Sequence, residues 1–184
     1  MKSKIFLSIF CVIIIFTSSL VILPTTKADD PGYDQQQTDH DWEVAISNNQ
    51  GFYHFIAQSF KPTKNRLCDV EVYIMNCYEP TEELKVSIRE NLDGVDLATS
   101  TMSSSNIPTY PPAWIEFPMN DIAVTIDQTY YIVLSMDYEN IPAPSYYAWG
   151  WSENSQYTRG EMYSKTSPDS NWDSSGWTGC DTCF

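Results

Sequence analysis

Apolar and polar positions alternate in short runs from residue 42 onward, and turn residues separate these runs. The alternation is clearest at residues 68–75 and 84–89. A period of two residues predicts strands with one face toward a core and the other toward water. Less regular apolar runs predict further strands at 95–101, 114–117, 122–126 and 129–136, and Asn91–Gly94 predicts a tight turn before the first of these.

Roughly ten short strands at this spacing, without long helical periodicity, predict an all-β fold of the antiparallel β-sandwich type. We expect a jelly-roll arrangement, with an immunoglobulin-like sandwich as the alternative. The predicted domain covers residues 42–184. Residues 180–184 resemble the opening of a strand, so we expect a chain truncated before the last strand of its sandwich, with an exposed edge.

Residues 1–28 have the layout of a secretory signal peptide. Two lysines precede an apolar stretch at residues 5–23, and small residues follow up to Ala28. The alternative is an uncleaved membrane anchor, because the stretch is about 19 residues long and a spanning helix needs roughly 20. Cleavage is favoured because Pro24 and the small residues end the segment. We therefore expect a secreted, extracellular protein whose residues 29–41 form a flexible acidic lead-in.

The mature chain is strongly acidic. The whole sequence has 10 basic and 24 acidic side chains. Residues 1–28 contain three of the lysines and no acid, so cleavage leaves 7 basic and 24 acidic side chains, a net charge of −17. This excess predicts no nucleic-acid partner and, after signal cleavage, no membrane partner, because both polyanions would repel the protein. It is compatible with calcium or with basic partners.

Four cysteines remain once Cys11 is removed with the signal peptide. An even number in an exported domain predicts two disulfides among Cys68, Cys77, Cys180 and Cys183, with three possible connectivities. A Cys68–Cys77 bond requires the chain to turn back, because nine extended residues span roughly 30 Å and bonded cysteines have Cα atoms within about 7 Å. Otherwise the bonds join this region to the C-terminus. A zinc site is less favoured, since only Cys180 and Cys183 have the spacing of zinc ligands.

A series of motifs resembles a known group of domains. The motifs are Ala57–Thr63, Leu84–Ile88, Leu97–Ala98, Trp114–Phe117, Tyr130–Leu134, Tyr146–Gly150, Tyr157, Gly160, Met162–Tyr163, Trp172 and Asp181–Phe184. Their order resembles secreted bacterial and archaeal β-sandwich domains of the choice-of-anchor or uncharacterised exported type, over residues 42–184. The resemblance implies a place in a large surface protein, beside other domains that include carbohydrate-active modules, and one more strand after the last Phe. It implies no catalytic residues.

The sequence offers few residues that could support nucleophilic catalysis. The chain has two histidines, His40 in the lead-in and His54 at a strand. No serine lies in a nucleophile-elbow sequence, and there is no His-Glu-x-x-His motif. Pairs of carboxylates could cleave glycosides, but 24 acidic residues always offer such pairs. We therefore expect a protein that is not an enzyme.

Aromatic residues are concentrated between residues 146 and 177. Alternation places Tyr147, Trp149 and Trp151 on one strand face, which we expect to face the core. Rings on the following loops then remain for a ligand, because rings stack on apolar sugar faces while amides and carboxylates bind the hydroxyls. The predicted ligand-binding residues are the rings Tyr157, Trp172 and Trp177 and the polar residues Asn154 and Arg159 of the same segment. The alternative is that these rings also fill the core.

A calcium site is predicted at Asp169, Asn171 and Asp173, which present three oxygen ligands at alternate positions. Gly176 comes too late for the turn of an EF-hand loop, and no bidentate Glu follows. The alternative is a polar turn without a metal. We expect no other cofactor.

These features together predict a non-catalytic extracellular binding module whose ligand is a polysaccharide or a cell-surface glycan. A structural or adhesive surface domain without a small-molecule ligand is the alternative, and a secreted hydrolase is the third hypothesis.

Overall fold

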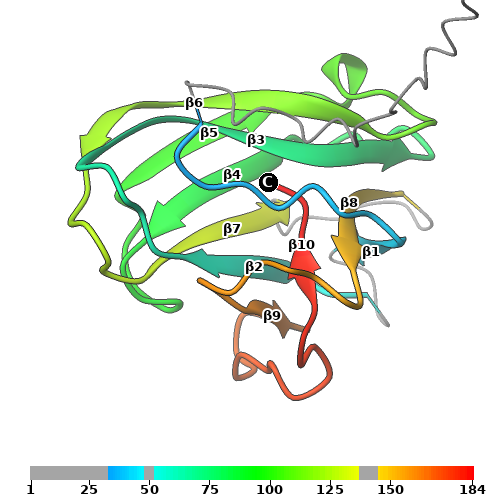
Figure 1. Cartoon of the computed structure of the whole chain (residues 1–184). Helices are drawn as coiled ribbons and strands as arrows, with labels where there is room; N and C mark the ends of the chain where they lie inside the picture. Colours follow the sequence, from blue (N-terminus) through cyan, green and yellow to red (C-terminus); the bar gives the residue numbers. More distant parts are fainter. Residues whose placement is uncertain (1–32, 48–51, 137–144) are drawn as a thin grey trace, which may run out of the picture. The chain divides into compact units, whose positions relative to one another are not determined.

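The structure, a computed structural model, describes residues 33–47, 52–136 and 145–184. Its regular elements are ten strands and one turn of 3-10 helix, η1 (Ser104–Asn106). The strands form two five-stranded sheets in which the paired strands are antiparallel. The predicted all-β antiparallel fold is therefore confirmed (Figure 1).

Each sheet combines strands from distant parts of the chain. The first sheet, sheet A, has the order β1 (Trp42–Ile46), β8 (Tyr146–Ser152), β3 (Arg66–Cys77) and β6 (Ala113–Ala123), and β10 (Asp181–Thr182) also pairs with β8. The second, sheet B, has the order β5 (Ala98–Met102), β4 (Leu84–Arg89), β7 (Tyr130–Met136), β2 (Phe55–Phe60) and β9 (Met162–Lys165).

The first eight strands pair in a nested way: β1 with β8, β2 with β7, β3 with β6 and β4 with β5. This is the pairing of one long antiparallel hairpin, in which β1 to β4 form one arm and β5 to β8 the other. Further pairs, β3 with β8 and β4 with β7, roll the hairpin into two sheets. This is the jelly-roll arrangement, rather than the immunoglobulin-like alternative.

The core lies between the sheets and consists of the inward-facing residues of alternating strands. Val70, Val72 and Ile74 are buried, whereas Glu71 and Tyr73 between them are half-buried on the other face of β3. The largest fully buried side chains are Trp149, Tyr130, Tyr147, Phe117, Ile46, Ile56, Ile74, Leu84, Ile88, Met119, Ile132 and Leu134. Each large apolar side chain buried in this way stabilises the fold by about 1.5–3 kcal/mol relative to an exposed one.

Two strand boundaries differ from the sequence prediction. Residues 114–117 and 122–126 were expected to form two strands, but one strand, β6, runs through Ala123. Asn120 and Asp121 take positive φ values of 57° and 56° within it, and the pairing with β3 shifts register between Leu67 and Asp69. The ladder therefore accommodates an irregularity where the polar sequence suggested a break.

The described part of the expected flexible lead-in, residues 33–41, lies against the sandwich. Gln37 is only 4% exposed, and its Nε2 donates to the carbonyl oxygen of Asp181 at 3.1 Å. Its backbone also exchanges two hydrogen bonds with Phe184, at 2.9 and 3.0 Å. These long-range contacts hold a segment whose composition alone suggested disorder.

The predicted signal peptide, residues 1–28, lies outside the described residues. Within the described part of the chain, no helix is long and apolar enough to cross a membrane. At the other end, the Phe184 ring is buried against Phe60 and Tyr157, with ring centroids 6.5 and 5.1 Å away.

Candidate functional site

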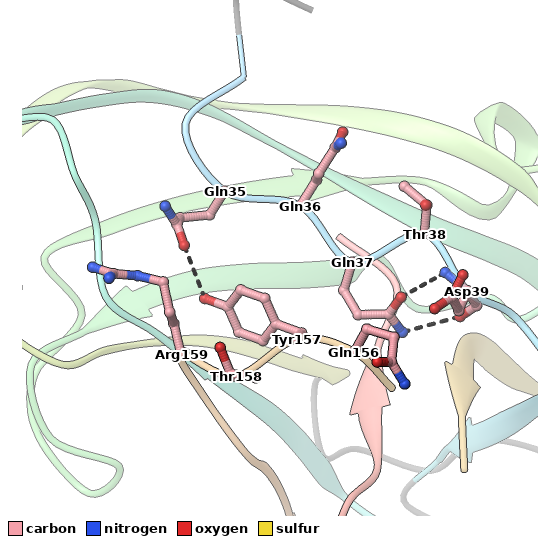
Figure 2. A pocket seen from close by; sticks show the side chains of 9 residues that line it. All are labelled: Gln35, Gln36, Gln37, Thr38, Asp39, Gln156, Tyr157, Thr158 and Arg159. Carbon is pink, nitrogen blue, oxygen red and sulfur yellow. Dashed lines mark hydrogen bonds between the residues drawn. The ribbon is translucent and has the colours of Figure 1, made fainter. Parts of the chain in front are cut away.

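A pocket of about 300 Å³ lies between residues 35–39 and the loop at 156–159. Ligand pockets in proteins begin at about this size. Figure 2 shows the extended segment 35–39 passing beside the loop, with the Tyr157 ring between them. The lining residues are Gln35, Gln36, Gln37, Thr38, Asp39, Gln156, Tyr157, Thr158 and Arg159.

Arg159 and Gly160 fix the loop against sheet B. The Arg159 guanidinium donates to the carbonyl oxygen of Lys61 from Nε and Nη2, at 3.1 and 2.9 Å, and to Asp127 Oδ1 at 2.5 Å. At Gly160 a Cβ atom would lie 1.8 Å from the carbonyl oxygen of Ser59, so no other residue fits this close approach of loop and strand. The hydrogen bonds of Arg159 therefore hold the pocket wall in place.

The opposite wall is held by Gln35 and Gln37. Gln37 Oε1 accepts from the backbone N–H of Asp39 at 2.5 Å, and its Nε2 donates to the carbonyl oxygen of Asp39 at 3.0 Å. Gln35 Nε2 donates to the carbonyl oxygen of Asp34 at 2.7 Å. These bonds keep the segment extended beside the loop.

Tyr157 forms the apolar part of the pocket. Its ring is half-buried and meets Phe184 edge to face. Burial raises the pKa of Tyr157 far above its ordinary value, so the hydroxyl is protonated at neutral pH. It donates to Gln35 Oε1 at 3.4 Å, which is a long bond that a ligand can replace (Figure 2).

Three exposed polar groups of the pocket make no hydrogen bond within the described chain: the Asp39 carboxylate, Gln156 Oε1 and the Thr158 hydroxyl. In contrast, Figure 2 shows Gln36 and Thr38 directed away from Tyr157. The free groups comprise two acceptors and one hydroxyl that both donates and accepts. They suit a ligand that carries several hydroxyl groups.

The structure places two of the five predicted ligand-binding residues, Tyr157 and Arg159, in this pocket. Asn154 lies nearby in sequence, and its carbonyl oxygen accepts from Gln156 Nε2 at 3.2 Å. The predicted rings of Trp172 and Trp177 are not among the lining residues. The three rings therefore do not form one ligand surface.

The two tryptophans lie at opposite faces of β9. Trp177 Nε1 donates to Ser164 Oγ at 2.9 Å, and its ring packs partly buried against the core. The ring of Trp172 lies under Lys165 Nζ, 5.7 Å from its centroid, and Nε1 donates to Asp93 Oδ1 at 3.0 Å. Since consecutive strand residues such as Ser164 and Lys165 point to opposite faces, these two rings cannot contact one ligand from the same side.

Residues 35–39 are the part of the pocket that the sequence did not reveal. The run Gln35–Gln37 was interpreted as part of a flexible, polar segment. Its only distinguishing signal is the lack of charge at three consecutive glutamines within an acidic stretch.

The predicted calcium ligands Asp169, Asn171 and Asp173 are exposed; Asp169 lies in a turn, and Asp173 forms an isolated β-bridge with Ser164. Asp173 exchanges two backbone bonds of 2.9 Å with Ser164, and its carboxylate accepts from the N–H of Ser175 at 2.8 Å, a backbone bond that lowers the pKa of Asp173. Among the described residues, no group of three or more His, Cys, Asp or Glu side chains is placed to hold a metal ion. The turn alternative accounts for Asp173 without a metal.

The prediction of two disulfides does not agree with the structure, in which all four described cysteines are free. Cys68 and Cys77 lie on one continuous strand, β3, so their Cα atoms are roughly 30 Å apart. Cys180 and Cys183 flank the extended β10 and are separated by roughly 10 Å. Both separations exceed the limit of about 7 Å for a disulfide.

The two histidines make no obvious catalytic arrangement. His40 Nε2 lies 3.2 Å from Glu43 Oε1, and its ring meets Tyr73 edge to face. His54 is 9% exposed, and burial lowers its pKa. Neither histidine lies within a strand: His40 precedes β1, and His54, expected inside a strand, lies in a bend directly before β2.

The resemblance to exported β-sandwich domains stays a hypothesis. Comparison with protein-family models, with curated proteins and with solved structures finds no match for this chain.

Proposed function

We propose that this protein is a non-catalytic binding module, and that its pocket takes a neutral, hydroxyl-rich ligand such as a glycan. The observation that carries the proposal is the chemistry of the lining: an aromatic ring beside free amide, hydroxyl and carboxylate groups, with the one cation, Arg159, already bonded to Lys61 and Asp127. A ring covers the apolar face of a sugar, and the polar groups exchange bonds with its hydroxyls.

The proposal includes export, which rests on the signal-peptide pattern of residues 1–28. A polysaccharide or a cell-surface glycan is then the ligand that such a module meets outside the cell. The pocket is small and partly open, so we expect modest affinity, roughly micromolar to millimolar.

A glycan array followed by isothermal titration calorimetry tests the proposal. Gln156→Ala and Asp39→Ala should each weaken binding about threefold to tenfold, because each removes one or two hydrogen bonds to the ligand. Tyr157→Ala should abolish measurable binding, and Asn91→Ala and Trp172→Ala, at residues that do not line the pocket, serve as controls.

Loss of affinity in the pocket variants with retained affinity in the controls supports the proposal. If no glycan on the array binds, the structural or adhesive alternative takes its place. If Trp172→Ala weakens binding as much as Tyr157→Ala, the ligand lies at β9 and not in the pocket. Release of a shortened product from a bound glycan would instead show a hydrolase.

A further inference from the structure

The outer face of sheet A carries an aromatic pair beside two carboxylates. Val72 and Ile74 of β3 are fully buried, which directs Glu71 and Tyr73 outward. In the antiparallel register Tyr73 lies opposite Trp114 and Glu71 lies opposite Glu116. We call these four side chains, Glu71, Tyr73, Trp114 and Glu116, the ring face.

The two rings lie side by side with their planes tilted by 45°, and solvent reaches the Trp114 ring. The centroids of Tyr73 and Trp114 are 5.3 Å apart, and 37% of Trp114 is exposed. Trp114 belongs to β6, which ends the sheet order on that side, so Tyr73 is its only neighbour across the ladder in the described chain. A large ring at an edge strand leaves a flat apolar surface available to a partner.

The two glutamates have the same charge at directly opposed positions. Such a pair is unfavourable in a sheet, because the charges lie on neighbouring strands within a short distance. Tyr33 Oη donates to Glu71, and no described basic side chain forms an ion pair with Glu71 or Glu116.

Sheet A also has almost no positive charge of its own. Arg66 is the only basic residue in its five strands, and its Nε donates to Asp121 Oδ1 at 2.6 Å. The whole chain carries a net charge of −14. The ring face therefore attracts a cation that the chain does not supply.

We propose that the ring face docks an arginine-containing segment of a partner polypeptide. The guanidinium group is planar and weakly hydrated, so it stacks on an aromatic ring while its N–H groups donate to a carboxylate. Trp114 with Tyr73 supplies the rings, and Glu116 with Glu71 supplies the acceptors. A lysine ammonium matches the charge of this site but not its flat geometry.

The probe is a Gly/Ser peptide with three arginines. A control peptide, its twin, is identical except that it has lysine at the three arginine positions. Both are titrated into the purified full chain at about 0.15 M ionic strength, where long-range attraction is screened beyond about 8 Å. We expect the arginine peptide to bind about twofold to fivefold more tightly than its twin.

Variants locate the contact. Trp114→Ala should remove the preference for arginine, Trp114→Phe should retain part of it, and Glu116→Gln should weaken binding about twofold to fivefold. Trp172→Ala, in the loop after β9, and Glu90→Gln, directly after β4, are the matched controls and should bind as the unmodified chain does. Thermal melts confirm that each variant is folded.

Equal binding of the two peptides, or equal losses in the controls, would overturn the proposal in favour of unspecific charge attraction. A glycan that binds the unmodified chain and not Trp114→Ala would also overturn it and would assign the ring face to sugars. Gln156→Ala should leave peptide binding unchanged, so the outcome at the ring face is independent of the outcome at the pocket.

Discussion

Gln58 and Asp181 meet between the two sheets, although 123 positions separate them: Gln58 Nε2 donates to Asp181 Oδ1 at 2.6 Å. Gln58 lies on the core face of β2, and Asp181 belongs to β10 of sheet A. Gln58 Oε1 also accepts from the backbone N–H of Thr182 at 2.9 Å. One buried amide therefore bonds both residues of β10 from the opposite sheet.

Asp181 should make stability depend on pH. Burial raises its pKa, and the side chains that donate to it, Gln58 and Ser155, are neutral. The folded protein thus keeps the Asp181 proton to higher pH than the unfolded chain, whose carboxyl has a pKa of about 3.9. The resulting stabilisation is complete below the unfolded pKa and is lost as pH rises through the folded pKa.

Asp181→Asn tests this dependence, because asparagine keeps the Oδ1 acceptor and does not ionise. Urea unfolding at a series of pH values should show the free energy of unfolding of the variant rising relative to the unmodified protein as the pH is raised above about 4, the pKa of the unfolded carboxyl. The exposed control Gln128→Ala, which removes no ionisable group, should show no such trend. Parallel pH profiles for Asp181→Asn and the unmodified protein would contradict the expectation.

Gln58→Leu should destabilise the protein by about 2–4 kcal/mol, because it leaves the Thr182 N–H and the Asp181 carboxyl without their buried partner. Urea unfolding measures the change. The control is Gln128→Leu at an exposed turn, where about 0.5 kcal/mol or less is expected. Similar losses at both positions would show that Gln58 contributes no more than a surface amide.

The parts of the fold that the sequence predicted are those with a local period. Alternation at 68–75 and 84–89 predicted β3 and β4, and it assigned Tyr147 and Trp149 to the core, where both are fully buried. A period of two depends only on near neighbours and a single buried face, so one sequence is enough to detect it.

The parts that the sequence did not predict depend on partners far along the chain. Gln37 was assigned to a flexible segment because its neighbours are polar, yet Asp181 and Phe184 bury it. Long-range contacts decide this outcome, and composition does not encode them. The cysteines differ: their even number suggested disulfides, although the alternation at 68–75 already indicated an extended run that keeps Cys68 and Cys77 apart, as β3 does.

Phe184→Ala should destabilise the protein by about 3–5 kcal/mol, the usual range for truncating a buried Phe. The ring is 9% exposed and packs on Phe60 and Tyr157, so its loss leaves a cavity behind the pocket. Urea unfolding measures the change. Tyr110→Ala, at a ring that is 80% exposed, is the control and should change stability by about 0.5 kcal/mol or less. An equal effect at both rings would argue against a packing role for Phe184.

The four cysteines of the sandwich should react with iodoacetamide in an order set by their exposure. Cys68 is exposed, whereas Cys183 is fully buried and burial raises its pKa to about 12. Since the thiolate is the reactive species and must be reached by the reagent, Cys183 should be alkylated more than about tenfold more slowly than Cys68 in the folded protein. Peptide mapping by mass spectrometry measures both rates, and Cys68→Ser, which should remove only the fast label, is the control.

In urea, without reductant, all four thiols should be alkylated to the same extent. A disulfide-linked pair of peptides in that digest would show that the strands can separate or shift enough to bring two of these cysteines together.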